Sequence, residues 1–268
     1  FLHLIASFLI TCISLIFNAL AWKYLLELFK FNGAKINTVK LYLKSNILKY
    51  LPGGIWHFVD RIRVLRQSNS SIDSFVLVAL EPFLMLIAAL LWIPFGQINI
   101  FIRITSLFPL LIIIPKSREI IFNRFLVYMQ GKLIKSNIIN TNLDSPEEMK
   151  KNYNKFPFKP LLLEMIFILS RFIGFFLCLK AFNISNHLYF FDWISTFAFA
   201  WICGLIVPGA PGGIGVFEAT FLLLTGGIVI EGPFILSLLC YRIVSTLADI
   251  TMYSLSRLIK NKRIIYSK

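Results

Sequence analysis

The sequence contains few of the residues from which soluble enzymes build active sites. Only 15% of its 268 residues are charged, it has three histidines, and its four cysteines show no CxxC spacing. No HExxH, GxSxG or Walker-type motif occurs, and no histidines and cysteines are clustered. The sequence therefore gives no support for a metal site or an activated nucleophile, and we expect neither a metal nor a cofactor.

Apolar residues are abundant instead. They make up 57% of the chain, and the mean hydropathy is +0.77. A soluble domain of this length could not bury so much apolar surface. Long apolar runs predict an all-α, polytopic membrane protein of about six to eight membrane segments, some of them broken or re-entrant, in a single integral membrane domain over residues 1–268. The runs cover residues 2–22, 75–95, 100–114, 161–182, 191–207, 214–230 and 234–258.

The basic residues lie between the apolar runs. Residues 23–73 and 116–159 hold nine Lys and Arg each, and five follow from Arg257, whereas the gaps 96–99, 183–190 and 231–233 hold none. The positive-inside rule then predicts a cytoplasmic loop at 116–159 and a cytoplasmic C-terminus in a plasma (inner) membrane. This placement also accounts for the net charge of +14 without a nucleic-acid partner.

Three parts of this topology stay open. The runs 191–207 and 214–230 are 17 residues each, so they predict either two full crossings or one hairpin that dips in and returns. Residues 36–51 have helical apolar spacing interrupted by lysines, which indicates an interfacial helix or the first arm of a re-entrant hairpin. The chain begins at Phe1 inside an apolar run, which favours a further span upstream.

One short pattern occurs twice, 159 residues apart: PGGIWHF at residues 52–58 and PGGIGVF at residues 211–217. We name these the first and second PGG segments. Proline removes a backbone donor and glycine admits unusual backbone angles, so each segment should break a helix. Matching interruptions in two pseudo-repeated halves of a membrane chain indicate a transport site. The alternative is that both are sharp turns at the membrane surface.

The surroundings of both segments resemble a known family. NILKYLPGGIW at residues 46–56, with Arg61 and Arg63 following, and GLIVPGAPGGIGVFE at residues 204–218 are similar to two signatures of the lysylphosphatidylglycerol synthase transmembrane-region family. This family includes the flippase-like membrane part of the multiple peptide resistance factor and its stand-alone relatives. The resemblance implies a protein that moves or presents a lipid across the bilayer. No aminoacyl-transferase domain is present in the sequence, which argues against lipid aminoacylation.

Charged residues inside apolar runs are costly and are candidates for function. Glu218 lies one turn into the helix after the second PGG segment, where it either stabilises the helix N-terminus or contacts a headgroup. Arg171 and Arg242 should pair across helices with Glu218, Glu81 or Asp249, or bind a lipid phosphate. Arg61 and Arg63 either gather anionic headgroups at the cytoplasmic mouth or only set topology. Trp56 and His57 are expected to be interfacial anchors.

The leading hypothesis is a non-enzymatic lipid flippase or scramblase that acts on an anionic phospholipid or a polyprenyl-phosphate-linked lipid. The alternative is a membrane enzyme or accessory subunit that acts on lipid-linked glycans beside a glycosyltransferase, using acidic residues of the loop such as Asp144, Glu147 and Glu148. The expected partners are an anionic membrane lipid and a glycosyltransferase or lipid-modifying enzyme. The substrate-binding candidates are Pro52, Gly53, Gly54, Arg61, Arg63, Arg171, Pro211, Gly212, Gly213, Gly215, Glu218 and Arg242.

Overall fold

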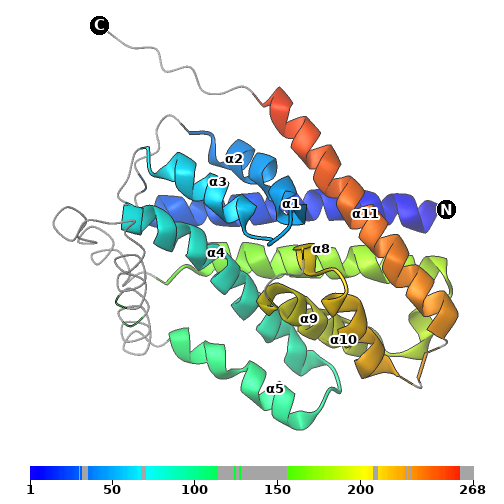
Figure 1. Cartoon of the computed structure of the whole chain (residues 1–268). Helices are drawn as coiled ribbons and strands as arrows, with labels where there is room; N and C mark the ends of the chain where they lie inside the picture. The colour runs from blue at the N-terminus through cyan, green and yellow to red at the C-terminus, as the bar shows by residue number, and fades with distance from the viewer. Residues whose placement is uncertain are drawn as a thin grey trace, which may run out of the picture.

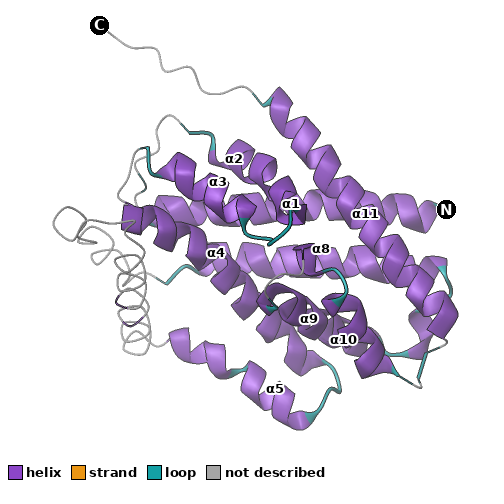
Figure 2. Cartoon of the chain, in the orientation of Figure 1, coloured by secondary structure: helices purple, strands orange, loops and turns teal. Residues whose placement is uncertain are grey.

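A computed structural model describes most of the chain, and every regular element in the described part is a helix (Figure 2). The described residues are 1–29, 31, 36–67, 71–113, 124, 127, 156–207, 211–226, 228–229 and 231–259. Most of the predicted cytoplasmic loop 116–159, with Asp144, Glu147 and Glu148, lies outside them. The α-helices are α1 (Leu2–Leu28), α2 (Thr38–Asn46), α3 (Trp56–Leu65), α4 (Ser71–Trp92), α5 (Ile100–Ser106), α8 (Phe158–Ala181), α9 (Phe190–Ile206), α10 (Val216–Thr225) and α11 (Glu231–Leu258).

Four helices are long and apolar enough to cross a membrane: Leu2–Leu28, Asp73–Phe95, Phe158–Ala181 and Gly232–Leu258. The all-helical fold with several membrane-spanning candidates is therefore confirmed in the described residues. Three shorter apolar helices, Ile100–Leu111, Phe190–Ile206 and Val216–Thr225, do not reach that length. The predicted total of about six to eight segments and the pseudo-repeat remain predictions.

The longest helix contact joins α1 to α8, which run side by side while α11 crosses them obliquely (Figure 1). A stripe of small polar residues on α1, which includes Ser7 and Thr11, makes this approach close. Ser7 Oγ donates to Gly174 O at 2.6 Å, and a Cβ atom on Gly174 would lie 2.5 Å from Thr11 Oγ1. Small residues allow membrane helices to pack tightly, so this pair forms the rigid centre of the bundle.

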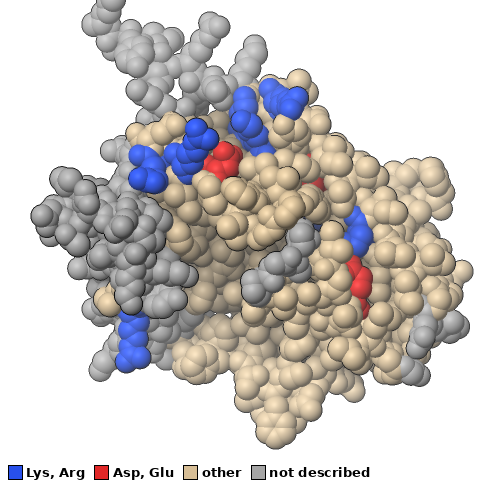
Figure 3. All heavy atoms as spheres, in the orientation of Figure 1, with Lys and Arg blue, Asp and Glu red and all other residues tan. Residues whose placement is uncertain are grey.

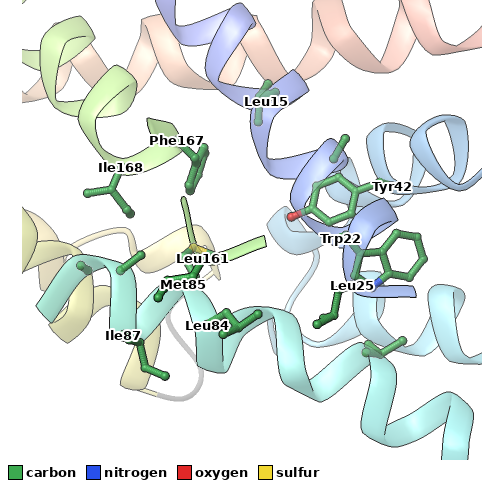
Figure 4. Close-up of a cluster of buried hydrophobic side chains, with 14 of the residues drawn as sticks. Leu15, Trp22, Leu25, Tyr42, Leu84, Met85, Ile87, Leu161, Phe167 and Ile168 are labelled. Atoms are coloured by element: carbon green, nitrogen blue, oxygen red, sulfur yellow. The ribbon is translucent and has the colours of Figure 1, made fainter. Parts of the chain in front are cut away.

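Two apolar clusters fill the interior. The first gathers side chains of α1, α2, α4 and α8, among them Leu15, Tyr42 and Phe167, and is drawn in Figure 4. The second is mostly aromatic, with Phe175 in contact with Phe197, Phe221 and other rings of α9, α10 and α11. The cavity described below lies beside these clusters, so its walls are held by packed side chains.

Both PGG segments interrupt helices, as predicted. The first follows the 3₁₀ helix η1 (Ile47–Tyr50) and precedes α3, and the second contains the 3₁₀ helix η5 (Pro211–Gly213) before α10. Their glycines have positive φ angles, for example 93° at Gly53 and 72° at Gly213, a region that other residues avoid. Residues 36–51 form α2 and η1, and α2 packs against α1 and α11, so this segment is a packed arm of the bundle.

Two apolar runs are more broken than their composition predicts. Within the run 100–114 the described residues form α5 and then the 3₁₀ helix η3 (Phe108–Ile113), because Pro109 lacks a backbone N–H donor and disfavours a continuous α-helix. Within the run 214–230 only Val216–Thr225 is α-helical, and the helix ends at Gly226. Neither run therefore forms one continuous α-helix over its described residues, and whether either run crosses the membrane remains a prediction.

Candidate functional site

A cavity of about 330 Å³ lies where the two PGG segments meet. Gly53 and Gly54 line it from the first segment, and Gly212 and Gly213 line it from the second. Tyr50, two residues before the first segment, contacts the second segment, since a Cβ atom on Gly212 would lie 3.2 Å from Cε1 of the Tyr50 ring. The prediction that the two segments approach each other beside a cavity is confirmed, and the depth of this cavity in a membrane remains a prediction.

The cavity has an apolar rim and a polar interior. Ile55 and Ile206 stand at the rim with 57% and 61% of their surface exposed, together with the exposed Val207. The exterior is largely uncharged on the face seen in Figure 3. Inside, four lining side chains are cationic and one is a carboxylate, and further carboxylates pair with these cations from behind the wall. The polar lining side chains are Asn18, Tyr42, Asn46, Lys49, His57, Arg61, Glu81, Arg171 and Arg242.

Arg242 of α11 fastens the second PGG segment. Its Nη1 and Nη2 atoms donate to the carbonyl oxygens of Gly212 at 3.0 Å and Gly213 at 2.9 Å, and its Nε donates to Glu218 Oε1. Glu218 Oε2 accepts from Gly215 N at 2.7 Å, which caps the start of α10. The guanidinium and the carboxylate together stabilise a backbone that only glycine adopts easily.

Asp249 of α11 fastens the helical arm that leads to the first PGG segment. Its carboxylate accepts from Asn46 Nδ2 at 2.9 Å and Tyr50 Oη at 2.6 Å, and it pairs with Lys49 Nζ at 2.8 Å. Burial lowers the pKa of Lys49, while the Asp249 charge opposes this change. Burial and Asp249 both raise the pKa of Tyr50, so its hydroxyl stays a donor.

Arg61 of α3 lies inside the bundle, with 1% of its surface exposed. Its Nε donates to Ser45 Oγ at 2.8 Å, its Nη1 lies 3.2 Å from Glu81 Oε2, and its guanidinium stacks 3.7 Å from the centroid of the Tyr42 ring. The expectation that Arg61 stands at an open mouth is therefore wrong. Arg63 is exposed and does not line the cavity, because two residues along a helix turn the side chain to another face.

Arg171 of α8 is the least satisfied cation of the cavity wall. It is buried, and its Nη2 atom lies 3.9 Å from Asp249 Oδ1, a distance too long for a strong ion pair. Its Nε and Nη1 atoms make no hydrogen bond of good geometry in the described part of the chain, and the buried Tyr241 hydroxyl, which interacts with the guanidinium, also lacks such a bond there. Unpaired donors on a buried guanidinium are costly, so this position suits an anion that supplies acceptors.

His57 and Trp56 lie in different environments in the structure. Trp56 is exposed and donates from Nε1 to Pro52 O at 2.8 Å, a placement compatible with the expected anchor. His57 instead lines the cavity, and its role as an interfacial anchor remains a prediction. Burial, with Arg61 and Lys49 nearby, lowers the pKa of His57 to about 3, which keeps the ring neutral at physiological pH.

The structure brings seven of the twelve predicted site residues to the cavity wall: Gly53, Gly54, Arg61, Arg171, Gly212, Gly213 and Arg242. Gly215 and Glu218 act behind the wall through Arg242, as the expected helix-capping role of Glu218 implies. Pro52, Arg63 and Pro211 are not among the lining residues, and the side chain of Pro211 is outside the described set. The predicted pairing of Arg242 across helices is present as Arg242–Glu218, and that of Arg171 is present only as the long contact with Asp249. Glu81 pairs instead with Arg61, which the sequence did not predict.

Sequence reasoning missed four polar lining residues: Asn18, Tyr42, Asn46 and Lys49. Their spacing contained a signal, because Tyr42, Asn46 and Lys49 recur every three or four residues on one helical face. Asn18 continues the polar stripe of α1 at the same period. A polar stripe inside an otherwise apolar run indicates a face turned toward a polar interior.

A scan against protein-family models finds no match for this chain, and a search of curated proteins finds no matching relative.

Proposed function

We propose that this chain is a flippase- or scramblase-like membrane protein, and not an enzyme, that moves or presents an anionic lipid across the plasma (inner) membrane. The lipid class is an anionic phospholipid or a polyprenyl-phosphate-linked lipid. The single observation that carries the proposal is the buried, incompletely paired guanidinium of Arg171 on the wall of an apolar-rimmed cavity.

The guanidinium of Arg171 carries buried N–H donors that are not hydrogen-bonded. Leaving a buried donor unsatisfied costs about 1–3 kcal/mol. A phosphate group offers several strong acceptors and a negative charge, and arginine is the side chain best suited to bind it. A headgroup phosphate beside Arg171 would therefore supply acceptors for Nε and Nη1.

The rest of the cavity matches the two-part chemistry of a lipid. The polar interior suits a headgroup, and the exposed rim residues Ile55, Ile206 and Val207 suit the hydrocarbon chains that remain outside it. A Cβ atom on Gly53 would meet nothing within 4 Å, so this glycine leaves the wall open for a headgroup to approach the backbone closely. The cavity thus supports presentation of a headgroup without extraction of the whole lipid from the bilayer.

The resemblance of residues 46–56 and 204–218 to the lysylphosphatidylglycerol synthase transmembrane-region family supports the same proposal. Both stretches contribute to the cavity wall, through Asn46, Lys49, Gly53 and Gly54 in one and Gly204–Val207, Gly212 and Gly213 in the other. Residues 208–210 of the second stretch lie outside the described residues. The parts of the sequence that carry the resemblance are therefore the parts that form the candidate site.

The experiment is lipid transfer in reconstituted vesicles. The full chain is inserted into phosphatidylcholine vesicles that carry a trace of fluorescent phosphatidylglycerol or fluorescent phosphatidylcholine, and a membrane-impermeant quencher reports transfer between leaflets. We expect faster transfer of phosphatidylglycerol. Arg171→Gln should lower the rate per inserted molecule by about tenfold or more, the effect of losing about 1.4 kcal/mol of binding.

A matched control removes an exposed guanidinium from the same bundle. Arg257→Gln changes a side chain on the surface of α11 that contacts Tyr253, and it should leave the transfer rate unchanged. Equal rates for the two lipids, together with an unchanged rate in Arg171→Gln, would contradict the proposal. Arg171→Lys separates charge from hydrogen bonding, and a partial loss is expected because one ammonium cannot replace three guanidinium nitrogens.

A further inference from the structure

A second buried polar centre lies beside the cavity and is not explained by phosphate binding. It joins Glu81 of α4 and Glu164 of α8, with 2% and 1% of their surfaces exposed, through the side chain of Asn18 on α1. With the Asn18 amide nitrogen turned toward the carboxyl groups, it lies 3.2 Å from Glu81 Oε1 and 3.0 Å from Glu164 Oε1. The two carboxyl groups therefore share one amide in the apolar interior.

The two carboxyl groups have very different partners. Glu81 Oε1 accepts from Tyr42 Oη at 2.5 Å, and Glu81 Oε2 is paired with Arg61 Nη1 at 3.2 Å. Burial and the Glu81 charge raise the pKa of Tyr42 well above its usual value, so Tyr42 remains a donor. Glu81 thus has the environment of a stabilised carboxylate.

Glu164 lacks the tyrosine donor and the arginine partner that Glu81 has. Its Oε2 atom has no hydrogen-bond partner, and no cationic nitrogen of the described residues lies within ion-pair distance of it. An unpaired carboxylate in an apolar interior costs far more than a neutral carboxyl group. If Glu81 and Glu164 were both ionised, the single guanidinium of Arg61 could neutralise only one of them.

The helices packed around Glu164 do not supply that charge. From α1, α2, α3 and α4 the facing groups are Asn18, Tyr42, Arg61 and Glu81, and only Arg61 is cationic. The charged side chain of α9, Asp192, accepts instead from Gln97 N at 2.7 Å. On α11, Asp249 is occupied by Lys49, and on α8 itself Arg171 lies two turns away, beside Asp249.

We propose that Glu164 is a binding site for an exchangeable proton, connected to the lipid cavity through Asn18, Tyr42 and Glu81. These three side chains line the cavity, whereas Glu164 lies behind them. With the Asn18 nitrogen turned toward the carboxyl groups, Glu164 Oε1 accepts from the amide, and Oε2, which has no partner among the described residues, is left to carry the proton.

The consequence for transport rests on the function proposed above. A phosphate bound near Arg171 adds negative charge to the cavity, and added negative charge favours the protonated form of Glu164. By linkage, a proton on Glu164 must favour phosphate binding to the same extent. The anionic headgroup and the proton are therefore expected to enter and leave the site together.

The first test does not depend on transport. Difference infrared spectroscopy of the full chain in vesicles should show a protonated carboxyl band at neutral pH that is absent in Glu164→Gln. The band should persist in Glu27→Gln, which removes an exposed carboxylate paired with Lys23. A spectrum that Glu164→Gln leaves unchanged would overturn the proton site, whatever the protein transports.

The second test measures transfer of fluorescent phosphatidylglycerol as a function of pH. Wild-type transfer should change by up to about tenfold per pH unit across the titration, as one titrating group requires, and Glu164→Gln should abolish that dependence. Measurable transfer with the same pH profile in both proteins overturns the coupling but leaves the lipid function intact. If replacing sodium by choline at constant pH abolishes transfer only in the wild type, a metal cation occupies the site and the proton assignment is wrong.

Discussion

The guanidinium of Arg242 on α11 and the carboxylate of Glu218 on α10 form an ion pair that holds the second PGG segment from both sides. Arg242 binds the carbonyl oxygens of Gly212 and Gly213, and Glu218 binds the amide of Gly215. Neither side chain is fully buried, with exposures of 22% and 18%. The pair therefore stabilises the segment chiefly through charged hydrogen bonds to its backbone.

Arg242→Gln should lower the free energy of unfolding by about 2 kcal/mol, because it removes charged hydrogen bonds and leaves two glycine carbonyls without their donor. Thermal unfolding in detergent measures the change. Arg257→Gln, on the exposed surface of the same helix, should stay within about 0.5 kcal/mol of the wild type. Equal stability of the two variants would show that Arg242 does not hold the segment.

Gly213→Ala and Gly53→Ala should differ although both residues have positive φ angles, 72° and 93°. A positive φ angle costs an added side chain about 1–2 kcal/mol in each case. A Cβ atom on Gly213 would also lie 3.1 Å from Gly204 O and 3.2 Å from Gly204 Cα, whereas nothing lies within 4 Å of one on Gly53. Gly213→Ala should therefore be the less stable variant by about 1 kcal/mol or more in chemical denaturation.

His57 should make the protein acid-sensitive. Its pKa is about 3 in the folded chain and about 6.5 when exposed, so the unfolded state binds more protons between these values. The contribution of His57 to stability is complete above about pH 6.5 and is lost as the pH falls toward 3, with a slope of up to about 1.4 kcal/mol per pH unit.

The measurement for His57 compares unfolding curves of the wild type and His57→Asn from pH 7 down to pH 4. The variant should lose less stability than the wild type over this range, because asparagine takes up no proton. Parallel curves would mean that the His57 ring is solvated and titrates in the folded chain as it does in water.

Gly174→Ala should push α1 and α8 apart, because the added Cβ atom would lie 2.5 Å from Thr11 Oγ1. Overpacking of this kind costs about 1–3 kcal/mol. Thr11→Ala removes the hydroxyl oxygen that causes the clash, so the double variant should recover most of the lost stability. Additive losses in the double-mutant cycle would show that the two residues are not in contact.

Composition and periodicity predict the coarse fold because the constraint is local. A run of about 20 apolar residues must be helical in a bilayer, whatever its neighbours are. The breaks at Gly53 and Gly213 were predictable for the same reason, since proline and glycine act on their own backbone. The shorter helices were harder, because apolar composition alone does not show that α10 ends at Gly226.

The candidate site was only partly predictable, because its partners are distant in sequence. The sequence shows charged side chains at Arg61 and Glu81, but it does not indicate whether each faces solvent, binds substrate or pairs with the other. Only the packing of α3 on α4 shows that they pair. The place of Lys49 in the site could not be predicted for another reason. It lies in a basic stretch whose other lysines support a purely topological role, and its partner Asp249 is about 200 residues away in the sequence.

Arg242 and Asp249 on α11 fix the spacing between the second PGG segment and the helical arm that leads to the first. Arg242 and Asp249 are seven residues apart, which is close to two helical turns, or about 10 Å, and places both on one face. Inserting one residue between them would rotate Arg242 by about 100° relative to Asp249. The helix could then keep the contacts of only one of these two side chains at a time. The length of this stretch is thus under tighter constraint than its composition, and outward residues such as Ile243 and Leu247 are free to vary among apolar types.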